Sequence, residues 1–200
     1  MPFLFKRLVL FLSITAAFAA DKEGAPFRPD AAGRYPHHQT NDKVTIGVDP
    51  YVTGDKVKVA FGKLNPYEYG VLPVLVVIQN DGNSAIRLDR IEAVYTGPQG
   101  DKVDATPAGE VRYVQGPRRP SVVSPGPVGD IEKLKGKKGP LAAWEIEGRA
   151  FAAKMLPAGQ TASGFFYFQT GLQRGATIYL SGLANAASNQ ELFYYEIPLE

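Results

Sequence analysis

Two adjacent histidines, His37 and His38, are the only imidazole groups in the chain and its first candidates for metal ligation. A tight zinc site needs three or four ligands, and Asp30, Asp42 or the N-terminal amine could contribute the others. Copper would also favour sulfur ligands, but the chain has no cysteine and Met155 is its only methionine after Met1. The alternative, which the polar surroundings favour, is a solvated histidine pair. We predict no cofactor.

Six basic side chains in a stretch rich in proline and glycine, residues 116–140, suggest a binding loop. They are Arg118, Arg119, Lys133, Lys135, Lys137 and Lys138. Such a loop could bind another envelope protein or an anionic surface, which attracts each nearby cation by about 1 kcal/mol. Nucleic acid is not expected, because no aromatic side chain lies beside the lysines to stack on bases. The alternative, which we favour, is a loop that its charge keeps soluble.

Three aromatic residues, Trp144, Tyr194 and Tyr195, suggest a surface that stacks on sugar rings. Adjacent residues of a strand point to opposite faces, so one of the two tyrosines should face outward unless another element covers it. A helix within residues 141–155 could provide that cover. We favour this second arrangement, in which the aromatic rings are part of the packing.

Catalytic patterns are absent from the sequence. There is no G-x-S-x-G turn, no H-E-x-x-H helix and no phosphate-binding glycine loop. The absence of cysteine removes thiol nucleophiles, and a serine triad would have to use His37 or His38. Paired carboxylates, Asp89 with Glu92 or Glu145 with Glu147, could flank a glycosidic bond, but nothing in the sequence fixes their separation. We therefore predict that the protein is not an enzyme.

The first nineteen residues have the three parts of a secretory signal peptide. Lys6 and Arg7 are basic, residues 8–18 are apolar, and residues 17–19 read Ala-Phe-Ala, a cleavage site. The apolar run is about half of the ~20 residues that a spanning helix needs. We expect cleavage and export to the periplasm or beyond, with no membrane span afterwards. Loss of Lys6 and Arg7 would leave equal numbers of acidic and basic residues.

The apolar, β-branched run at residues 71–78 predicts the central strand of the fold, buried on both faces. Pro73 cannot donate a backbone hydrogen bond, so it should lie near the start of this strand or at a bulge. Asp81-Gly82 then predicts a hairpin to a second strand over residues 86–95. The apolar residues change parity within that second strand, so a bulge near Asp89-Arg90 is expected.

The remaining patterns predict short strands separated by turns. Residues 20–43 are polar and predict an extended N-terminal arm, whereas residues 54–64 favour a short helix over a strand. Residues 141–156 could form a helix whose C-terminal part is instead strand. Strands are expected at residues 44–48, near 103, at 111–113, 161–170, 176–181 and 192–199. This makes residues 44–200 one mostly β domain, an immunoglobulin-like antiparallel β-sandwich of seven to eight strands with one or two short helices.

Several short motifs resemble exported bacterial proteins that have an immunoglobulin-like sandwich and no assigned activity. They are Phe61-Gly62, Leu72-Pro73-Val74, Ile78-Gln79-Asn80-Asp81, Leu156-Pro157-Ala158-Gly159 and Tyr195-Glu196-Ile197-Pro198. The resemblance covers residues 44–200 and implies the fold, but no catalytic residues. We therefore expect an exported, non-catalytic binding or accessory protein of the cell envelope. The alternatives are a periplasmic metal-binding protein using His37 and His38, or a carbohydrate-binding module.

Overall fold

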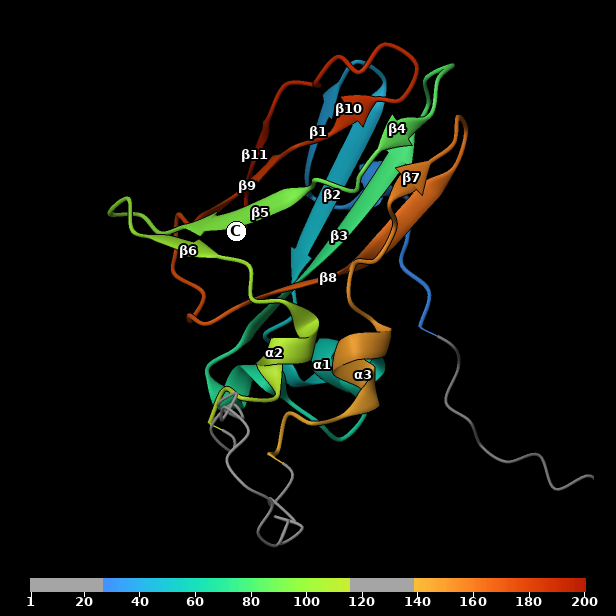
Figure 1. Cartoon of the computed structure of the whole chain (residues 1–200). Coiled ribbons are helices and arrows are strands. Elements are labelled where there is room, and N and C mark those ends of the chain that lie inside the picture. The colour runs from blue at the N-terminus through green and yellow to red at the C-terminus, as the bar shows by residue number, and fades with distance from the viewer. Residues whose placement is uncertain (1–26, 116–138) are drawn as a thin grey trace, which may run out of the picture.

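The computed structural model describes residues 27–115 and 139–200, which form a mostly β fold with antiparallel sheets and few helices (Figure 1). The first sheet has the strand order β1 (His37–Asn41), β2 (Val44–Pro50), β3 (Leu72–Asn80), β8 (Thr161–Phe168). The second sheet has the order β11 (Tyr195–Pro198), β9 (Thr177–Ser181), β5 (Glu92–Thr96), β6 (Lys102–Asp104). A small third sheet joins three two-residue strands, β10 (Ala184–Asn185), β4 (Ile86–Arg87) and β7 (Met155–Leu156).

Strand β3 is the central strand that the sequence predicts, because it pairs with β2 on one side and β8 on the other. Its residues are buried on both faces, as expected from the unbroken apolar run. Pro73 is the second residue of β3, which confirms its expected place near the strand start. Its carbonyl accepts a hydrogen bond of 2.9 Å from the backbone nitrogen of Tyr51, just after β2 ends.

Two hydrophobic cores lie on the two faces of the first sheet. The larger core fills the space between the two four-stranded sheets and includes Val76 of β3, Ile178 of β9 and Tyr195 of β11. The smaller core lies between the first sheet and the helices and includes Leu75 of β3 and Phe165 of β8. The described chain is therefore layered as second sheet, first sheet and helices (Figure 1).

The helices are short and pack on the face of the first sheet that is turned away from the second sheet. They are α1 (Gly54–Phe61), α2 (Ala108–Val111), α3 (Trp144–Gly148) and the 3-10 turns η1 (Ala32–Arg34) and η2 (Pro66–Tyr69). The prediction of a helix at residues 54–64 is confirmed, with one buried face made by Val57, Ala60 and Phe61. The strand predicted at residues 111–113 is wrong, because Val111 ends α2 and packs in the helix-side core. The stretch 141–156 splits into α3 and β7, so only part of it is helical.

The predicted hairpin at Asp81-Gly82 is wrong. Strand β3 ends at Asn80, and the next strand, β4, pairs with β7 and β10 in the small sheet instead of with β3. The chain then turns at Asp89-Arg90 and enters the second sheet as β5. The change of parity that suggested a bulge is explained by two short strands in different sheets.

The described part of the N-terminal arm is more ordered than the sequence suggested. Residues 37–41 form β1, which pairs with β2 along its whole length, so they are an edge strand of the first sheet. Asp42 and Lys43 connect the two strands with positive φ angles of 46° and 63°, the backbone geometry of a tight two-residue hairpin. The polar composition concealed this strand because an edge strand is half exposed.

The number of strands also differs from the prediction, and two predicted segments lie outside the described residues. The described residues contain eleven strands instead of seven to eight, since β4, β7 and β10 have only two residues each. The signal peptide expected at residues 1–19 and most of the loop expected at 116–140 lie outside the described residues. Within residues 27–115 and 139–200, no helix has the length and apolar character to cross a membrane.

Buried tyrosines predict that the protein loses stability at alkaline pH. Burial raises the pKa of the hydroxyl groups of Tyr51, Tyr167 and Tyr195 above their ordinary value of 10.0. The unfolded chain then loses these protons more readily than the folded chain, so stability is full below about pH 10 and falls as the pH rises above it. Urea unfolding between about pH 8 and pH 11 measures this fall. Tyr167→Phe should make the fall shallower, and equal slopes in the two proteins would contradict this account.

Candidate functional site

The two four-stranded sheets are joined closely along one side. There, Gln39 Oε1 accepts a hydrogen bond of 3.0 Å from the Glu196 backbone nitrogen, and Asn41 Nδ2 donates to the Tyr194 carbonyl at 3.3 Å. The Tyr195 hydroxyl donates to the carbonyls of Asn41 and Val44, each at 3.3 Å. These contacts join β1 of the first sheet to β11 of the second.

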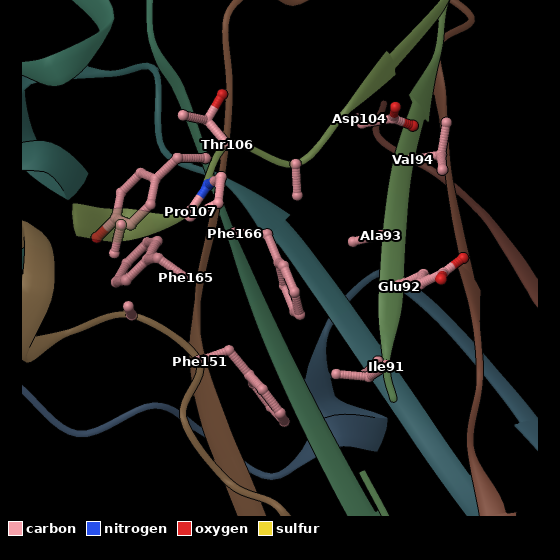
Figure 2. A pocket seen from close by; sticks show the side chains of 14 residues that line it. Ile91, Glu92, Ala93, Val94, Asp104, Thr106, Pro107, Phe151, Phe165 and Phe166 are labelled. Atoms are coloured by element: carbon pink, nitrogen blue, oxygen red, sulfur yellow. The ribbon is translucent and has the colours of Figure 1, made fainter. Parts of the chain in front are cut away.

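The opposite side, between β8 and β5, is open and forms the inter-sheet groove, which has a volume of about 600 Å³ (Figure 2). Its walls are mainly apolar and include Ile91, Ala93, Ala105, Pro107, Phe151 and Phe166. A cavity of this size and character is typical of small-molecule binding sites. The inter-sheet groove is therefore the candidate functional site.

One wall of the groove consists of two stacked phenyl rings, those of Phe151 and Phe166, with centroids 5.3 Å apart and planes inclined by 19°. Phe166 is held by β8. Phe151 is held by a short parallel contact with β8, in which its nitrogen donates to the Phe165 carbonyl at 3.0 Å and the Phe165 nitrogen donates to the Arg149 carbonyl at 2.9 Å. Gly164 permits this approach because its missing side chain leaves room for the Phe151 backbone.

The facing wall comes from β5 and the residues just before it. Figure 2 shows Ile91 and Ala93 pointing toward the phenyl rings, whereas Glu92 and Val94 point away from them. This is the ordinary alternation of a strand. Asp104 is the cross-strand partner of Val94 and lies on the same outer side of the sheet. The carboxylates near the groove therefore belong to its rim and outer surface.

The polar groups along the groove are mostly engaged within the protein. The backbone nitrogen of Ala105 donates to the Ala93 carbonyl at 3.0 Å, and that of Thr106 donates to the Tyr167 carbonyl at 2.7 Å. The Tyr167 hydroxyl donates to the Ile146 carbonyl at 2.7 Å, and burial raises its pKa. This hydroxyl keeps its proton at neutral pH. Among the described residues, the side chains that point into the groove are mainly apolar, and the carboxylates of Glu92 and Asp104 lie at its rim and outer side.

The structure separates the side chains of His37 and His38. They are consecutive residues of β1, one half-buried and one exposed, so their side chains leave opposite faces of the strand. His38 Nδ1 lies 2.7 Å from the Tyr35 carbonyl oxygen. Among the described residues, no group of three or more histidine, cysteine, aspartate or glutamate side chains could hold a metal ion. The geometry gives no support to one metal site shared by both imidazoles.

The aromatic residues predicted for sugar stacking are not gathered in one place. Trp144 begins α3 in the helix layer, far from β11 in Figure 1. Tyr195 is 0% exposed, so its assignment as a stacking residue is wrong, whereas Tyr194 is 53% exposed. One of the two tyrosines therefore faces outward, as strand alternation allows. The favoured arrangement, in which a helix within residues 141–155 covers these rings, is wrong, because Tyr194 is exposed and Trp144 is 70% exposed. The basic residues Arg118, Arg119, Lys133, Lys135, Lys137 and Lys138 lie outside the described residues.

The carboxylate pairs considered for glycoside hydrolysis are partly engaged in ion pairs. Asp89 lies 3.5 Å from Arg87 Nε, and Glu147 pairs with Arg112. Both contacts are at the surface, where such pairs contribute little stability. Asp89, Glu145 and Glu147 do not line the inter-sheet groove, whereas Glu92 lies on β5 with its side chain on the outer side.

Sequence reasoning missed the inter-sheet groove. The strand predicted at residues 161–170 contains Phe165-Phe166-Tyr167-Phe168, and Phe151 lies within residues 141–156, where the sequence predicted a helix with a C-terminal part that could be strand. The available signal was that a strand with aromatic residues at consecutive positions sends one ring to each face. The partner residues near Ile91 are far away in the sequence, so no local pattern joins the two walls.

Comparison with known proteins adds no functional assignment. No protein-family model and no curated protein matches the chain. The chain is similar to the crystal structure of a Bordetella pertussis protein provisionally named ApaA, with 11% identity, a TM-score of 0.36, and coverage of 77% of this chain and 87% of that one. It is also similar to the X-ray structure of a second structural-genomics target, with 8% identity, a TM-score of 0.35, and coverage of 79% and 88%. Similarities this low carry no argument about what the chain does.

Proposed function

We propose that this chain is an exported, non-catalytic binding protein with an immunoglobulin-like sandwich, which takes a small apolar ligand into the inter-sheet groove. The observation that carries the proposal is the wall of stacked rings, Phe151 and Phe166, facing Ile91 and Ala93. Two antiparallel sheets around a shared core support the immunoglobulin-like assignment. The sequence features of a signal peptide support export to the periplasm or beyond.

The character of the walls indicates the class of ligand. The side chains that point inward are aliphatic or aromatic, and the neighbouring carboxylates of Glu92 and Asp104 lie on the outer side. A charged group placed between the rings and Ile91 would lose its hydration without gaining a partner. The ligand is therefore uncharged where it enters the groove, with a flat ring or a short hydrocarbon chain that fits about 600 Å³.

A role as an accessory protein is also consistent with a groove that binds an uncharged group. A ligand of the cell envelope, or an apolar side chain of a partner protein there, would present the uncharged surface that the groove accepts. The predicted basic loop could add contacts with an envelope protein or an anionic surface. Both sources would present an uncharged apolar group, so the first experiment tests whether the groove binds such a group.

Titration with N-phenyl-1-naphthylamine, an uncharged dye that fluoresces in apolar surroundings, tests the proposal. We expect saturable binding of one dye per protein molecule. Phe151→Ala removes half of the ring wall and should weaken binding about tenfold, the size expected for losing one large apolar contact. Ala105→Phe places a ring inside the groove and should also weaken binding, this time by filling the space.

Val59→Ala is the matched control, because Val59 is 65% exposed on α1 and belongs to neither wall. It should leave the dye affinity unchanged. Thermal unfolding of each variant shows that the fold is retained. The proposal fails if the dye does not saturate, or if Phe151→Ala and Ala105→Phe both bind as tightly as the native chain.

A further inference from the structure

The outer face of the second sheet carries a pair of stacked tyrosine rings. Tyr179 lies on β9 between the inward-facing Ile178 and Leu180, so its side chain points outward. Tyr194 directly precedes β11, and its ring stacks on that of Tyr179 with centroids 5.0 Å apart and planes inclined by 28°. Tyr194 is 53% exposed, so one ring rests on a strand of the sheet and the other remains open to solvent.

No described helix covers this face. The helices α1, α2 and α3 pack on the first sheet and share the core on its far side (Figure 1). Large aromatic side chains usually bury their area. The Tyr194 ring is instead exposed while it stacks on the half-buried Tyr179, which makes this face a candidate binding surface.

Two carboxylates lie beside Tyr179 on the same face of the sheet, where its direct partner on β5 is Val94. Glu196 is the direct cross-strand partner of Tyr179 and is exposed. Glu92, also exposed, pairs with Ser181 and is the diagonal neighbour of Tyr179 on β5. The face therefore combines a flat apolar ring with carboxylate oxygens that accept hydrogen bonds.

We propose that Tyr194, supported by Tyr179 and flanked by Glu196 and Glu92, is a binding site for neutral polysaccharides. One face of a pyranose ring carries C–H groups that pack on an aromatic ring, while its hydroxyl groups donate to neighbouring carboxylates. The two acidic side chains disfavour anionic polysaccharides by repulsion. The site is on the outer side of the second sheet and does not depend on the inter-sheet groove.

Pairing of this edge with a second copy of the chain is less compatible with the structure. Strand β11 is the edge of the second sheet, and open edges often pair with another strand. Here, however, the Glu196 backbone nitrogen and the Tyr194 carbonyl are already bonded to the side chains of Gln39 and Asn41. The backbone groups of this edge are therefore already hydrogen-bonded within the chain, whereas the exposed ring of Tyr194 can contact a ligand.

Affinity electrophoresis of the purified protein in gels that contain a β-glucan, a xylan, a galactomannan or the anionic polysaccharide alginate tests the site. We expect at least one neutral polysaccharide to retard the protein and alginate to have no effect. Tyr194→Ala should weaken that binding about tenfold through loss of the stacking ring. Tyr179→Ala should weaken it less, by removing support, and Tyr179→Phe should retain it.

Phe193→Ala is the matched control, because Phe193 is 74% exposed beside Tyr194 yet stacks on no ring in the described residues. It should leave polysaccharide binding unchanged. The inference is overturned if none of the three neutral polysaccharides binds, if Phe193→Ala weakens binding as much as Tyr194→Ala, or if alginate binds equally well. It is also overturned if Tyr194→Ala converts a dimer to a monomer in gel filtration, since the face would then be a protein interface. Binding of the naphthylamine dye should not change in Tyr194→Ala.

Discussion

Asn80→Ala is expected to lower the free energy of unfolding by about 3 kcal/mol, because it removes a buried hub of hydrogen bonds. Asn80 is 0% exposed at the end of β3. Its amide nitrogen donates to the carbonyls of Ser84, Leu156 and Pro157 at 2.9, 3.2 and 3.1 Å, and its Oδ1 accepts from the Gly82 nitrogen at 3.0 Å. Alanine would remove all of these hydrogen bonds at the junction of the first and small sheets, although the Pro157 carbonyl also accepts one from the Gln160 nitrogen at 3.2 Å.

Urea unfolding followed by tyrosine fluorescence or circular dichroism measures this loss. Asn83→Ala is the control, since Asn83 is exposed in the same turn and should change stability by less than about 0.5 kcal/mol. Asn80→Asp should be at least as harmful as Asn80→Ala, because a carboxylate would face three carbonyl oxygens without a proton to donate. Equal stabilities for Asn80→Ala and Asn83→Ala would show that the turn keeps its conformation without the Asn80 side chain.

This same residue explains why the predicted hairpin failed. Asp81-Gly82 has the composition of a two-residue turn, and a local pattern cannot show that the preceding asparagine turns inward. The inward amide binds the segment at residues 84 and 156–157, and this directs the chain away from β3. The partners of β3 are β2 and β8 instead. Strand pairing between distant segments is the part of a β fold that one sequence reveals least.

Features with a local cause were predictable. The central strand β3 follows from an apolar run long enough for a strand buried on both faces, and α1 follows from the spacing of Val57, Ala60 and Phe61. Strand alternation predicts that one of Tyr194 and Tyr195 faces outward, although it does not say which. In contrast, β1 was missed because its residues are polar and, among the described strands, it pairs with β2 alone.

The two candidate sites also differ in how much of each the sequence could predict. The sequence named Tyr194 among the candidate stacking residues, but its support by Tyr179 depends on the pairing of β11 with β9. The inter-sheet groove could not be predicted, since its walls come from segments near residues 91–107 and 150–167. Sequence motifs for catalysis and metal binding have a fixed local spacing, whereas an apolar groove has none.

Gly164→Ala is expected to have the second large effect on stability, again about 3 kcal/mol, because it places an atom against backbone. A Cβ atom at residue 164 would lie 2.5 Å from the Phe151 nitrogen and 2.8 Å from the Ala150 carbonyl carbon. Backbone cannot rotate away as a side chain tip can, so residues 149–151 would have to move off β8. The hydrogen bonds that Phe165 exchanges with Arg149 and Phe151 would then be lost.

Amide hydrogen exchange at Phe151 and Phe165, together with urea unfolding, distinguishes local from global loss. We expect both amides to exchange faster in Gly164→Ala, and the naphthylamine dye to bind more weakly because the Phe151 ring no longer stacks on Phe166. Gly109→Ala is the matched control, since a Cβ there would meet nothing within 4 Å. If Gly164→Ala kept native stability and native amide protection, residues 149–151 would not be fixed to β8. The ring wall would then require another support, and the groove could not be treated as preformed.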